Sequence, residues 1–131
     1  MISKTSKQAI SAMTELARLP QDAYEGAGAI AKRINAPRNY LGKMLQLLSY
    51  RGLLVSQKGL GGGFRLARKP KDISLFDIVE NLDNVDRWSE CTLGFKHCSD
   101  TNPCAVHNEW KKVKDKYINF LNKTTLADLI K

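Results

Sequence analysis

All three cysteines and both histidines of this chain lie within one stretch of 17 residues, Cys91–His107. The stretch reads CTLGFKHCSDTNPCAVH, and most residues between its cysteines are Gly, Pro, Asn, Asp, Ser or Thr, which is the composition of a loop. Cysteines that only fill space are usually dispersed among apolar positions, as small hydrophobic residues are. Thiols gathered on a polar loop are instead typical of ligands for a soft metal ion or an iron–sulfur cluster.

The candidate metal ligands are Cys91, Cys98, Cys104 and His107, in the pattern C-x6-C-x5-C-x2-H. Cys104 and His107 stand three residues apart at the expected start of a helix, so their side chains share one face. The first turn of a helix also favours the thiolate form of Cys104, which is the form that binds metal. Gly94 allows the loop to fold back, so that the other two cysteines can approach this pair.

Three interpretations of this segment are open at this point. An iron–sulfur cluster suits wide and irregular spacing, because its ligands must span two or more irons. Structural zinc sites usually pair cysteines two to four residues apart, and the chain has no such pair. The third interpretation is thiols without a metal, either three unliganded cysteines or a disulfide-forming redox pair. The spacing favours the cluster, with zinc as an alternative cofactor.

Positive charge is concentrated in the first half of the 131-residue chain, whose net charge is +8. Residues 1–71 contain 13 Lys and Arg and 3 Asp and Glu, a net charge of +10. Residues 72–131 contain 8 and 10, a net charge of −2. This asymmetry indicates a module that binds a polyanion, joined to a near-neutral segment; a solvated basic surface is the alternative.

Apolar residues at helical spacing predict a first helix over Thr5–Leu19, which Pro20 ends. A short helix over Ala29–Ile34 and a third helix from Arg38 to about Arg51, opened by Pro37, follow. The buried stripe of the third helix is expected to comprise Tyr40, Leu41, Met44, Leu45, Leu47 and Leu48.

Two short strands, Gly52–Gln57 and Phe64–Ala67, flank a glycine-rich turn. Three helices followed by a hairpin is the element order of a winged helix-turn-helix, so we expect a mainly α fold that binds double-stranded DNA. The helix and the wing are both basic, which places cations near phosphates. The candidate DNA-binding residues are Lys4, Thr5, Arg38, Asn39, Tyr40, Lys43, Arg51, Lys58 and Arg65.

Outside the cysteine loop, the remainder of the chain is expected to be mostly helical. Ser74 with Asp77, and Thr125 with Asp128, have the spacing of capping boxes, the first of them opening a helix over Leu75–Leu82. Pro103 can open a helix of about 20 residues whose apolar stripe suits two-fold packing against a second copy. Covering the domain's own core is the alternative role of this stripe. Its members are Val106, Trp110, Val113, Tyr117, Phe120 and Leu121.

We accordingly divide one compact domain into three parts: a winged helix-turn-helix over 1–72, a linker helix and cysteine loop over 73–103, and a dimerisation helix with a short last helix over 104–131. The first seven residues lack the apolar core of a signal peptide, and no run approaches the ~20 apolar residues of a membrane span. We expect a cytoplasmic protein with reduced thiols and no membrane partner.

Taken together, these segments resemble the IscR/NsrR-type winged-helix family of bacterial iron–sulfur regulators. The resemblance covers essentially the whole chain, and the glycine-rich wing followed by three cysteines is its most specific feature. Besides the cysteine loop, the segments that carry it are Ser3–Thr5, Asn39–Leu45, Gly52–Leu66, Cys104–Trp110 and Phe120–Leu129.

The resemblance implies a homodimer that crosses its long helices, places its third helices in successive major grooves and directs its wings toward the minor groove. It matches the three cysteines to the family's cluster ligands, and His107 to the fourth ligand of the [2Fe–2S] assembly repressor. The nitric-oxide sensor holds [4Fe–4S] and uses an acidic residue of the first helix, where this chain has Gln8. This difference favours His107 as the fourth ligand. We expect a [2Fe–2S] cluster in preference to [4Fe–4S].

Two further differences from the assembly repressor limit what the resemblance implies about the cluster and about the operator. The first cysteine spacing is one residue longer here, so the cluster type does not follow from the resemblance. Gly42 replaces a glutamate that discriminates between operator types, so the operator need not match either known class.

The function predicted from these features is a transcriptional regulator, expected to be a repressor, whose operator affinity an iron–sulfur cluster controls. One rival keeps DNA binding but uses zinc or thiol chemistry as the redox-responsive element. Another is an iron–sulfur redox protein that does not bind DNA. No paired catalytic carboxylates, nucleophile motif or phosphate-binding loop occurs, so we expect neither enzymatic activity nor a small-molecule substrate.

Overall fold

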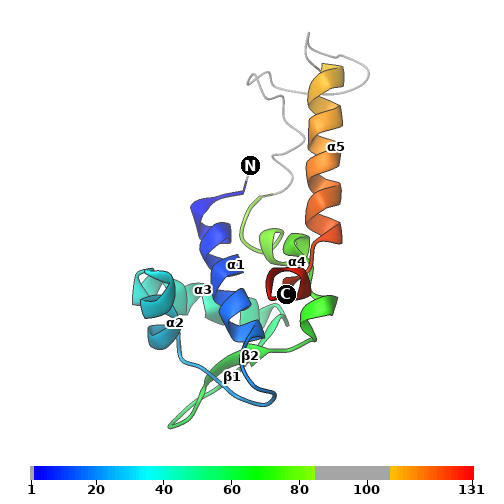
Figure 1. Cartoon of the computed structure of the whole chain (residues 1–131). Coiled ribbons are helices and arrows are strands. Elements are labelled where there is room, and N and C mark those ends of the chain that lie inside the picture. Colours follow the sequence, from blue (N-terminus) through cyan, green and yellow to red (C-terminus); the bar gives the residue numbers. More distant parts are fainter. Residues whose placement is uncertain (1, 85–106) are drawn as a thin grey trace.

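A computed structural model of the chain describes residues 2–84 and 107–131. Helices α1 (Lys4–Ala17), α2 (Ala27–Ile34) and α3 (Arg38–Tyr50) precede a two-stranded antiparallel sheet, which is the order of a winged helix-turn-helix (Figure 1). The predicted fold class is therefore confirmed. The remaining elements are β1 (Leu54–Gln57), β2 (Gly63–Leu66), the 3-10 turn η1 (Pro70–Asp72), α4 (Leu75–Val79), α5 (His107–Lys123) and α6 (Leu126–Leu129).

Helix α1 forms as its apolar spacing predicts, beginning one residue earlier than expected. The Ser3 hydroxyl caps it by accepting a hydrogen bond from the Ser6 backbone N–H at 3.1 Å. The helix ends at Ala17, ahead of Pro20. Its buried apolar residues recur at intervals of three and four, so that one face enters the core; they are Ala9, Ala12, Met13 and Leu16.

A tight turn separates α2 from α3. Asn35 adopts the left-handed conformation (φ 56°) that ends α2, and Pro37 stands directly before the first residue of α3. Most of the predicted stripe of α3 is buried, including Leu41, Leu45 and Leu48 at 0% exposure. The prediction that Tyr40 is buried is wrong: its side chain is 41% exposed, and its hydroxyl contacts α1 rather than the core.

The wing is held to the domain by a short backbone bridge. Strands β1 and β2 pair antiparallel, with Leu54 opposite Leu66, and Phe64 is the wing's buried anchor. On its outer side, the Phe64 N–H donates to the Glu25 carbonyl at 2.8 Å, and the Glu25 N–H returns a bond to the Phe64 carbonyl at 3.0 Å. The loop before α2 thus acts as a third, single-residue partner of the wing.

Helix α4 has the predicted capping box, but it is shorter than expected. The Ser74 hydroxyl accepts from the Asp77 N–H at 3.1 Å, and the Asp77 carboxylate accepts from the Ser74 N–H at 3.0 Å. Helix α4 ends at Val79 rather than Leu82. The Asn81 side-chain amide donates a hydrogen bond to the Asp77 carbonyl at 2.7 Å. If the helix continued, the Asn81 backbone N–H would donate to that carbonyl instead.

The C-terminal helices pack back on the domain. Leu121 of α5 is fully buried with Leu75 and Val79 of α4 in a second apolar cluster. Leu126 of α6 is buried in the main core, and its N–H donates to the Ile73 carbonyl at 3.0 Å. The first part of α5 extends beyond the other helices (Figure 1). Within 2–84 and 107–131, no helix combines the length and apolar character needed to cross a membrane.

We expect Gly63→Ala to lower the free energy of unfolding by about 1–3 kcal/mol. Gly63 has φ +135°, and a Cβ at this position would lie 2.3 Å from the Glu25 carbonyl carbon, so the bridge between wing and loop must shift. Urea unfolding followed by circular dichroism measures the change.

Gly42→Ala provides the matched control. Gly42 lies inside α3, where a Cβ would meet Ala27 at an ordinary 3.8 Å, so alanine should stabilise the helix by roughly 0.5–1 kcal/mol. Equal effects of the two substitutions would contradict the steric role of Gly63.

Candidate nucleic-acid interface

The solvent-facing side of α3 carries three of the predicted DNA contacts. Arg38, Asn39 and Lys43 are exposed along it, over its first two turns. They border a groove of about 370 Å³ between α2 and α3, which is completed by Ala27, Gly42 and Gln46. Gln46 was not among the predicted contacts, although its position three residues after Lys43 places it on the same helix face.

Arg38 lies across the start of α2. A Cβ at Gly28 would stand 3.1 Å from the Arg38 Nε, so the absence of a side chain at Gly28 leaves room for the guanidinium group. The close approach of α2 to the first residue of α3 therefore positions this cation. Arg38 remains exposed to solvent while it lines the groove.

Helix α1 contributes the other predicted contacts near α3. Lys4 is exposed, while the Thr5 hydroxyl is hydrogen-bonded to the Tyr40 hydroxyl of α3. The structure thus brings together two predicted site residues that are 35 positions apart in the chain. Lys7 is a further exposed cation of α1, and its spacing of three residues from Lys4 was the available signal.

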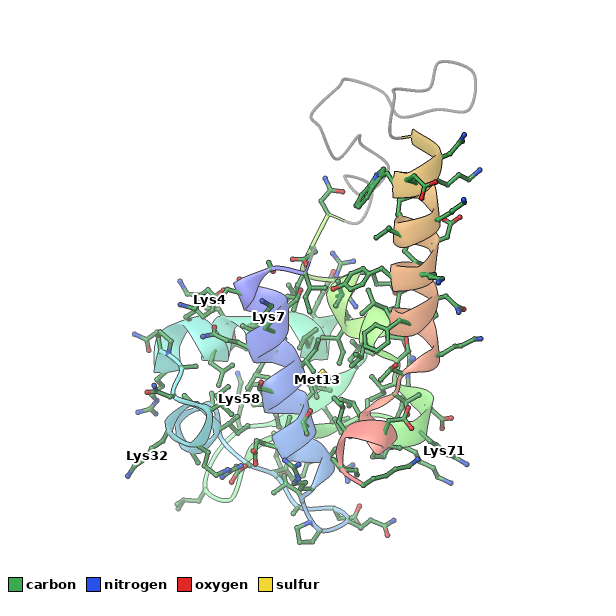
Figure 2. The ribbon with its side chains drawn as sticks, turned by 45° about the horizontal axis from the view of Figure 1, so that its top comes forward. Lys4, Lys7, Met13, Lys32, Lys58 and Lys71 are labelled. Carbon is green, nitrogen blue, oxygen red and sulfur yellow. The ribbon has the colours of Figure 1, made fainter. Side chains whose placement is uncertain are left out.

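Four exposed lysines of α1, α2 and the wing lie on one side of the molecule. In Figure 2, Lys4, Lys7, Lys32 and Lys58 lie on the side of α2 and the wing, whereas Lys71 lies on the opposite side near the foot of α5. This arrangement gives α1, α2, α3 and the wing a shared basic surface.

The predicted wing and helix-end cations differ in their surroundings. Lys58 is exposed in the turn between β1 and β2, and Arg51 is exposed at the C-terminal cap of α3. Arg65 is already engaged, because its guanidinium pairs with Asp22 at 2.8 Å and lies 5.0 Å from the Tyr24 ring centroid. The charge of Arg65 is therefore less available to a phosphate than the charge of Lys58.

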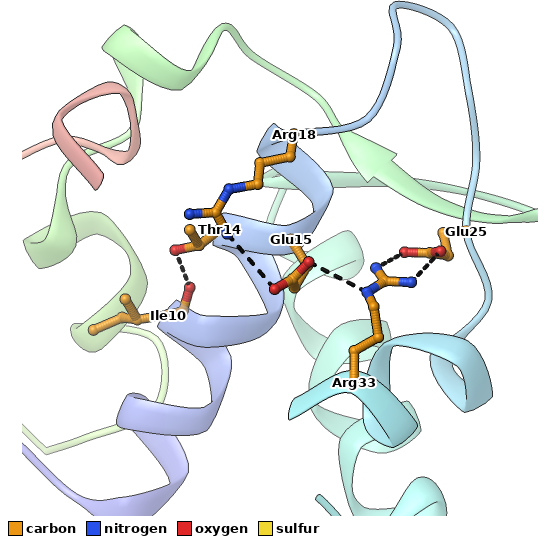
Figure 3. A network of polar contacts seen from close by, with 6 residues as sticks. All are labelled: Ile10, Thr14, Glu15, Arg18, Glu25 and Arg33. Carbon is orange, nitrogen blue, oxygen red and sulfur yellow. Dashed lines mark hydrogen bonds and ion pairs between the residues drawn. The ribbon is translucent and has the colours of Figure 1, made fainter. Parts of the chain in front are cut away.

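An ion-pair network joins α1, α2 and the loop that bridges to the wing (Figure 3). Arg33 of α2 pairs with both carboxylate oxygens of Glu25, one of them at 2.6 Å, and with Glu15 of α1 at 3.2 Å. The hydrogen bonds from Arg33 hold the pKa of the Glu25 carboxyl below its ordinary value, because they stabilise the charged form. Since the Glu25 backbone also pairs with Phe64, the network helps to position the wing relative to α2.

The predicted dimerisation stripe of α5 divides into two parts. Val113 and Phe120 are 55% and 52% exposed, and Trp110 and Tyr117 are half-buried. Leu121 instead lies wholly inside its own chain, where it packs against α4. Val106 lies outside the described residues.

The predicted metal ligands fall largely outside the described part of the chain. Cys91, Cys98 and Cys104 lie between the two described ranges, and His107 is the first residue of α5. Across 2–84 and 107–131, no three His, Cys, Asp or Glu residues gather in a way that could hold a metal ion.

Comparison with known proteins identifies the family. The model of the Rrf2 family, described as an iron-dependent transcriptional regulator, matches residues 2–131. The chain belongs to the Rrf2 family. A protein of Aquifex aeolicus named as an HTH-type transcriptional regulator is 37% identical over 132 residues, which cover 99% of this chain and 91% of that protein. The regulator IscR of Yersinia pseudotuberculosis is 27% identical over 98% of this chain and 78% of its own length.

Solved structures of Rrf2-type regulators have the same fold. T. potens IscR has a TM-score of 0.78 at 28% identity, covering 99% of this chain and 85% of that one. CymR of B. subtilis, titled a global cysteine regulator, has a TM-score of 0.84 at 26% identity, covering 99% and 95%. The protein is thus a DNA-binding transcriptional regulator of the Rrf2 family, and the exposed face of α3 with the wing is its candidate DNA surface.

We expect Arg33→Met to lower the free energy of unfolding by about 1 kcal/mol at neutral pH, since partly exposed ion pairs each contribute modestly. The pKa of Glu25 is lower in the folded state, so the stabilisation is present above its unfolded value and is lost as the pH falls through its folded value. The difference between the two proteins should therefore shrink below about pH 4. Urea titrations between pH 7 and pH 3 measure it.

Arg18→Met is the matched control, because Arg18 makes a single, longer ion pair with Glu15 at 3.6 Å from a more exposed position. It should cost less than Arg33→Met at neutral pH. A difference between wild type and Arg33→Met that stays constant across the pH range would refute the role assigned to Glu25.

Proposed function

We propose that this regulator binds its operator with an affinity that depends on an iron–sulfur cluster held by Cys91, Cys98, Cys104 and His107. The observation that carries the proposal is the presence of this donor set in a chain matched throughout by a family described as iron-dependent. Three thiolates and one imidazole fit a cluster chemically, because sulfur and imidazole nitrogen are its usual protein ligands. When bound, the cluster supplies a centre that responds to oxidation state and to small ligands.

The cluster type proposed is [2Fe–2S] in preference to [4Fe–4S]. Gln8, at the position where an acidic ligand is used by the nitric-oxide sensor, carries no charge, and its Oε1 is buried without a hydrogen-bond partner in the described part of the chain. A neutral amide oxygen is a weak ligand for iron compared with a carboxylate or an imidazole. This leaves His107 as the proposed fourth ligand.

The proposed DNA contacts divide by chemistry. Cations at the edge of the surface suit phosphates, and polar groups at the start of α3 suit base edges in the major groove. Asn39, Tyr40 and Lys43 are assigned to base edges. The phosphate contacts are assigned to the cations Lys4, Arg38, Arg51, Lys58 and, to a lesser degree, Arg65, which is already paired with Asp22. The Thr5 hydroxyl is also assigned to a phosphate, and Lys43 is assigned to both classes because it can reach either.

A homodimer is proposed because α5 presents apolar side chains that its own chain leaves exposed. Val113 and Phe120 are more than half exposed on this helix, and Trp110 and Tyr117 lie on the same stripe. Packing these faces together would bury them and relate two α3 helices by a two-fold axis. The matching operator has two half-sites about one helical turn apart, roughly 34 Å.

A second candidate keeps DNA binding and replaces the cluster with zinc or with thiol chemistry. The structural similarity to CymR, titled a cysteine regulator, favours it, as does a solved oxidised form of Staphylococcus aureus CymR that is 25% identical with a TM-score of 0.80. The two candidates differ in whether inorganic sulfide is present. An assay for acid-labile sulfide on the purified protein therefore distinguishes the two candidates.

We expect protein purified without oxygen to contain iron and acid-labile sulfide, both of which are lost in Cys98→Ser. Metal analysis and a sulfide assay on the same sample provide the readout. His97→Ala should keep both, because His97 is not assigned as a ligand. Zinc without sulfide would support the second candidate and overturn the cluster.

For DNA binding, we expect Lys58→Gln to weaken binding to all duplexes alike and to reduce the slope of log K against log salt by about one unit. The reason is that an exposed lysine at the wing turn neutralises one phosphate without reading a base. Fluorescence anisotropy at several salt concentrations measures the slope. Lys71→Gln, which lies on the opposite side of the molecule, should leave the slope unchanged. Loss confined to one sequence would show that Lys58 reads bases instead.

A further inference from the structure

The Asp83 carboxylate joins the two ends of the described N-terminal region. It accepts the Ser3 backbone N–H at 2.9 Å with one oxygen and the Ser3 hydroxyl with the other. The two residues are 80 positions apart in the chain, so tertiary structure alone brings them together. Both are half-buried, which strengthens a hydrogen bond to a charged acceptor.

These bonds determine how Ser3 caps α1. A hydroxyl has one proton, and because Ser3 donates it to Asp83, its lone pairs are directed to the Ser6 N–H at 3.1 Å. The first turn of α1 contains no acidic residue and carries Lys4, a charge that the positive end of the helix dipole disfavours. Asp83 supplies from elsewhere in the chain the negative charge that this helix end lacks.

Elements from the C-terminal half meet at the same place. Ile2, directly before Ser3, packs on the cluster formed by Val79 and Leu121 together with Tyr117 of α5. Burial raises the pKa of the Tyr117 hydroxyl; a hydrogen bond to the Ile2 backbone opposes this, and the charge of Asp83 adds to it. The start of α1 is thus held by α4, α5 and Asp83 rather than being a free chain end.

The held end of α1 is also the part that touches the recognition helix. Thr5, two residues after Ser3, makes the hydroxyl contact with Tyr40, which stands at the exposed start of α3. A shift of the first turn of α1 would therefore move the group that orients the Tyr40 ring. Asp83 contacts Ser3, the backbone at the start of α1 connects Ser3 to Thr5, and Thr5 contacts Tyr40.

We infer that Asp83 is a positioning residue for DNA recognition: by fixing the first turn of α1 through Ser3, it sets the Thr5–Tyr40 contact and hence the base-reading geometry of α3. Asp83 need not touch DNA itself. This inference rests on the sequence-selective reading by α3 assigned in the proposed function. It predicts a loss of selectivity rather than a loss of charge attraction.

The test uses the full chain and a duplex enriched by the wild-type protein from a random pool, with a scrambled duplex for comparison. Asp83→Asn can accept only one of the two Ser3 donors with its single amide oxygen, so we expect about a tenfold loss of affinity for the enriched duplex. Affinity for the scrambled duplex should not fall, because a negative charge has been removed. Asp72→Asn, which removes the same charge from an exposed position, should leave the ratio of the two affinities unchanged.

Thr5→Val is the second variant, since it leaves the Ser3 cap intact and removes the hydroxyl that contacts Tyr40. Loss of the phosphate contact assigned to Thr5 would weaken binding to both duplexes alike, so the ratio of the two affinities reports the Tyr40 contact. Thr5→Val should reduce selectivity as well, and its effect should be less than additive with Asp83→Asn because both act on one contact path. Thr14→Val, which removes a hydroxyl from the last turn of the same helix, should change selectivity little, and its effect should add to that of Asp83→Asn.

Three outcomes overturn the inference: equal affinity ratios for Asp83→Asn and Asp72→Asn, parallel losses on both duplexes, or full additivity of Asp83→Asn with Thr5→Val. Failure of the wild-type protein to enrich any duplex would instead overturn sequence-selective reading in the proposed function. The two failures are therefore distinguishable.

Discussion

The burial of one face of α1 is the constraint on which the arrangement depends. This helix contacts α2, α3, the second wing strand, α4 and α6, so its buried face is common to nearly every other element. Ala9 and Ala12 keep that face narrow, which allows neighbouring backbones to approach closely, and Met13 fills the centre (Figure 2). Because protein interiors are densely packed, a displacement of α1 must also displace the recognition helix α3 and the wing.

Polar contacts then set orientations that apolar packing leaves free. The Arg33 network fixes α2 against α1 and against the loop at Glu25, whose backbone pairs with the wing. Ser3 and Asp83 fix the other end of α1. Hydrophobic contact is non-directional, whereas these bonds have defined geometry, so the first holds the helices together and the second sets the angle of the DNA surface.

Local structure was largely predictable from the sequence, and each difference between the predicted and the observed elements has a specific cause. The capping box at Ser74 and Asp77 and the helix start after Pro37 followed from short-range chemistry, which needs no knowledge of the rest of the fold. Tyr40 was placed in the core because periodicity counts it as apolar, yet its hydroxyl finds a partner on α1. Helix α4 ended early because the Asn81 side chain competes with its own backbone for a carbonyl.

The sequence by itself determined the winged-helix order, the basic first half and the candidate donor set, because these depend on periodicity, turn residues, charge and residue type. Tertiary structure alone decided which predicted cations are already paired, as Arg65 is with Asp22, and which apolar residues of α5 remain exposed. It also decided the meeting of Ser3 with Asp83 and of Thr5 with Tyr40. Such contacts join residues 35 to 80 positions apart, and neither partner carries a local signal for the other, because their proximity arises only when the helices pack.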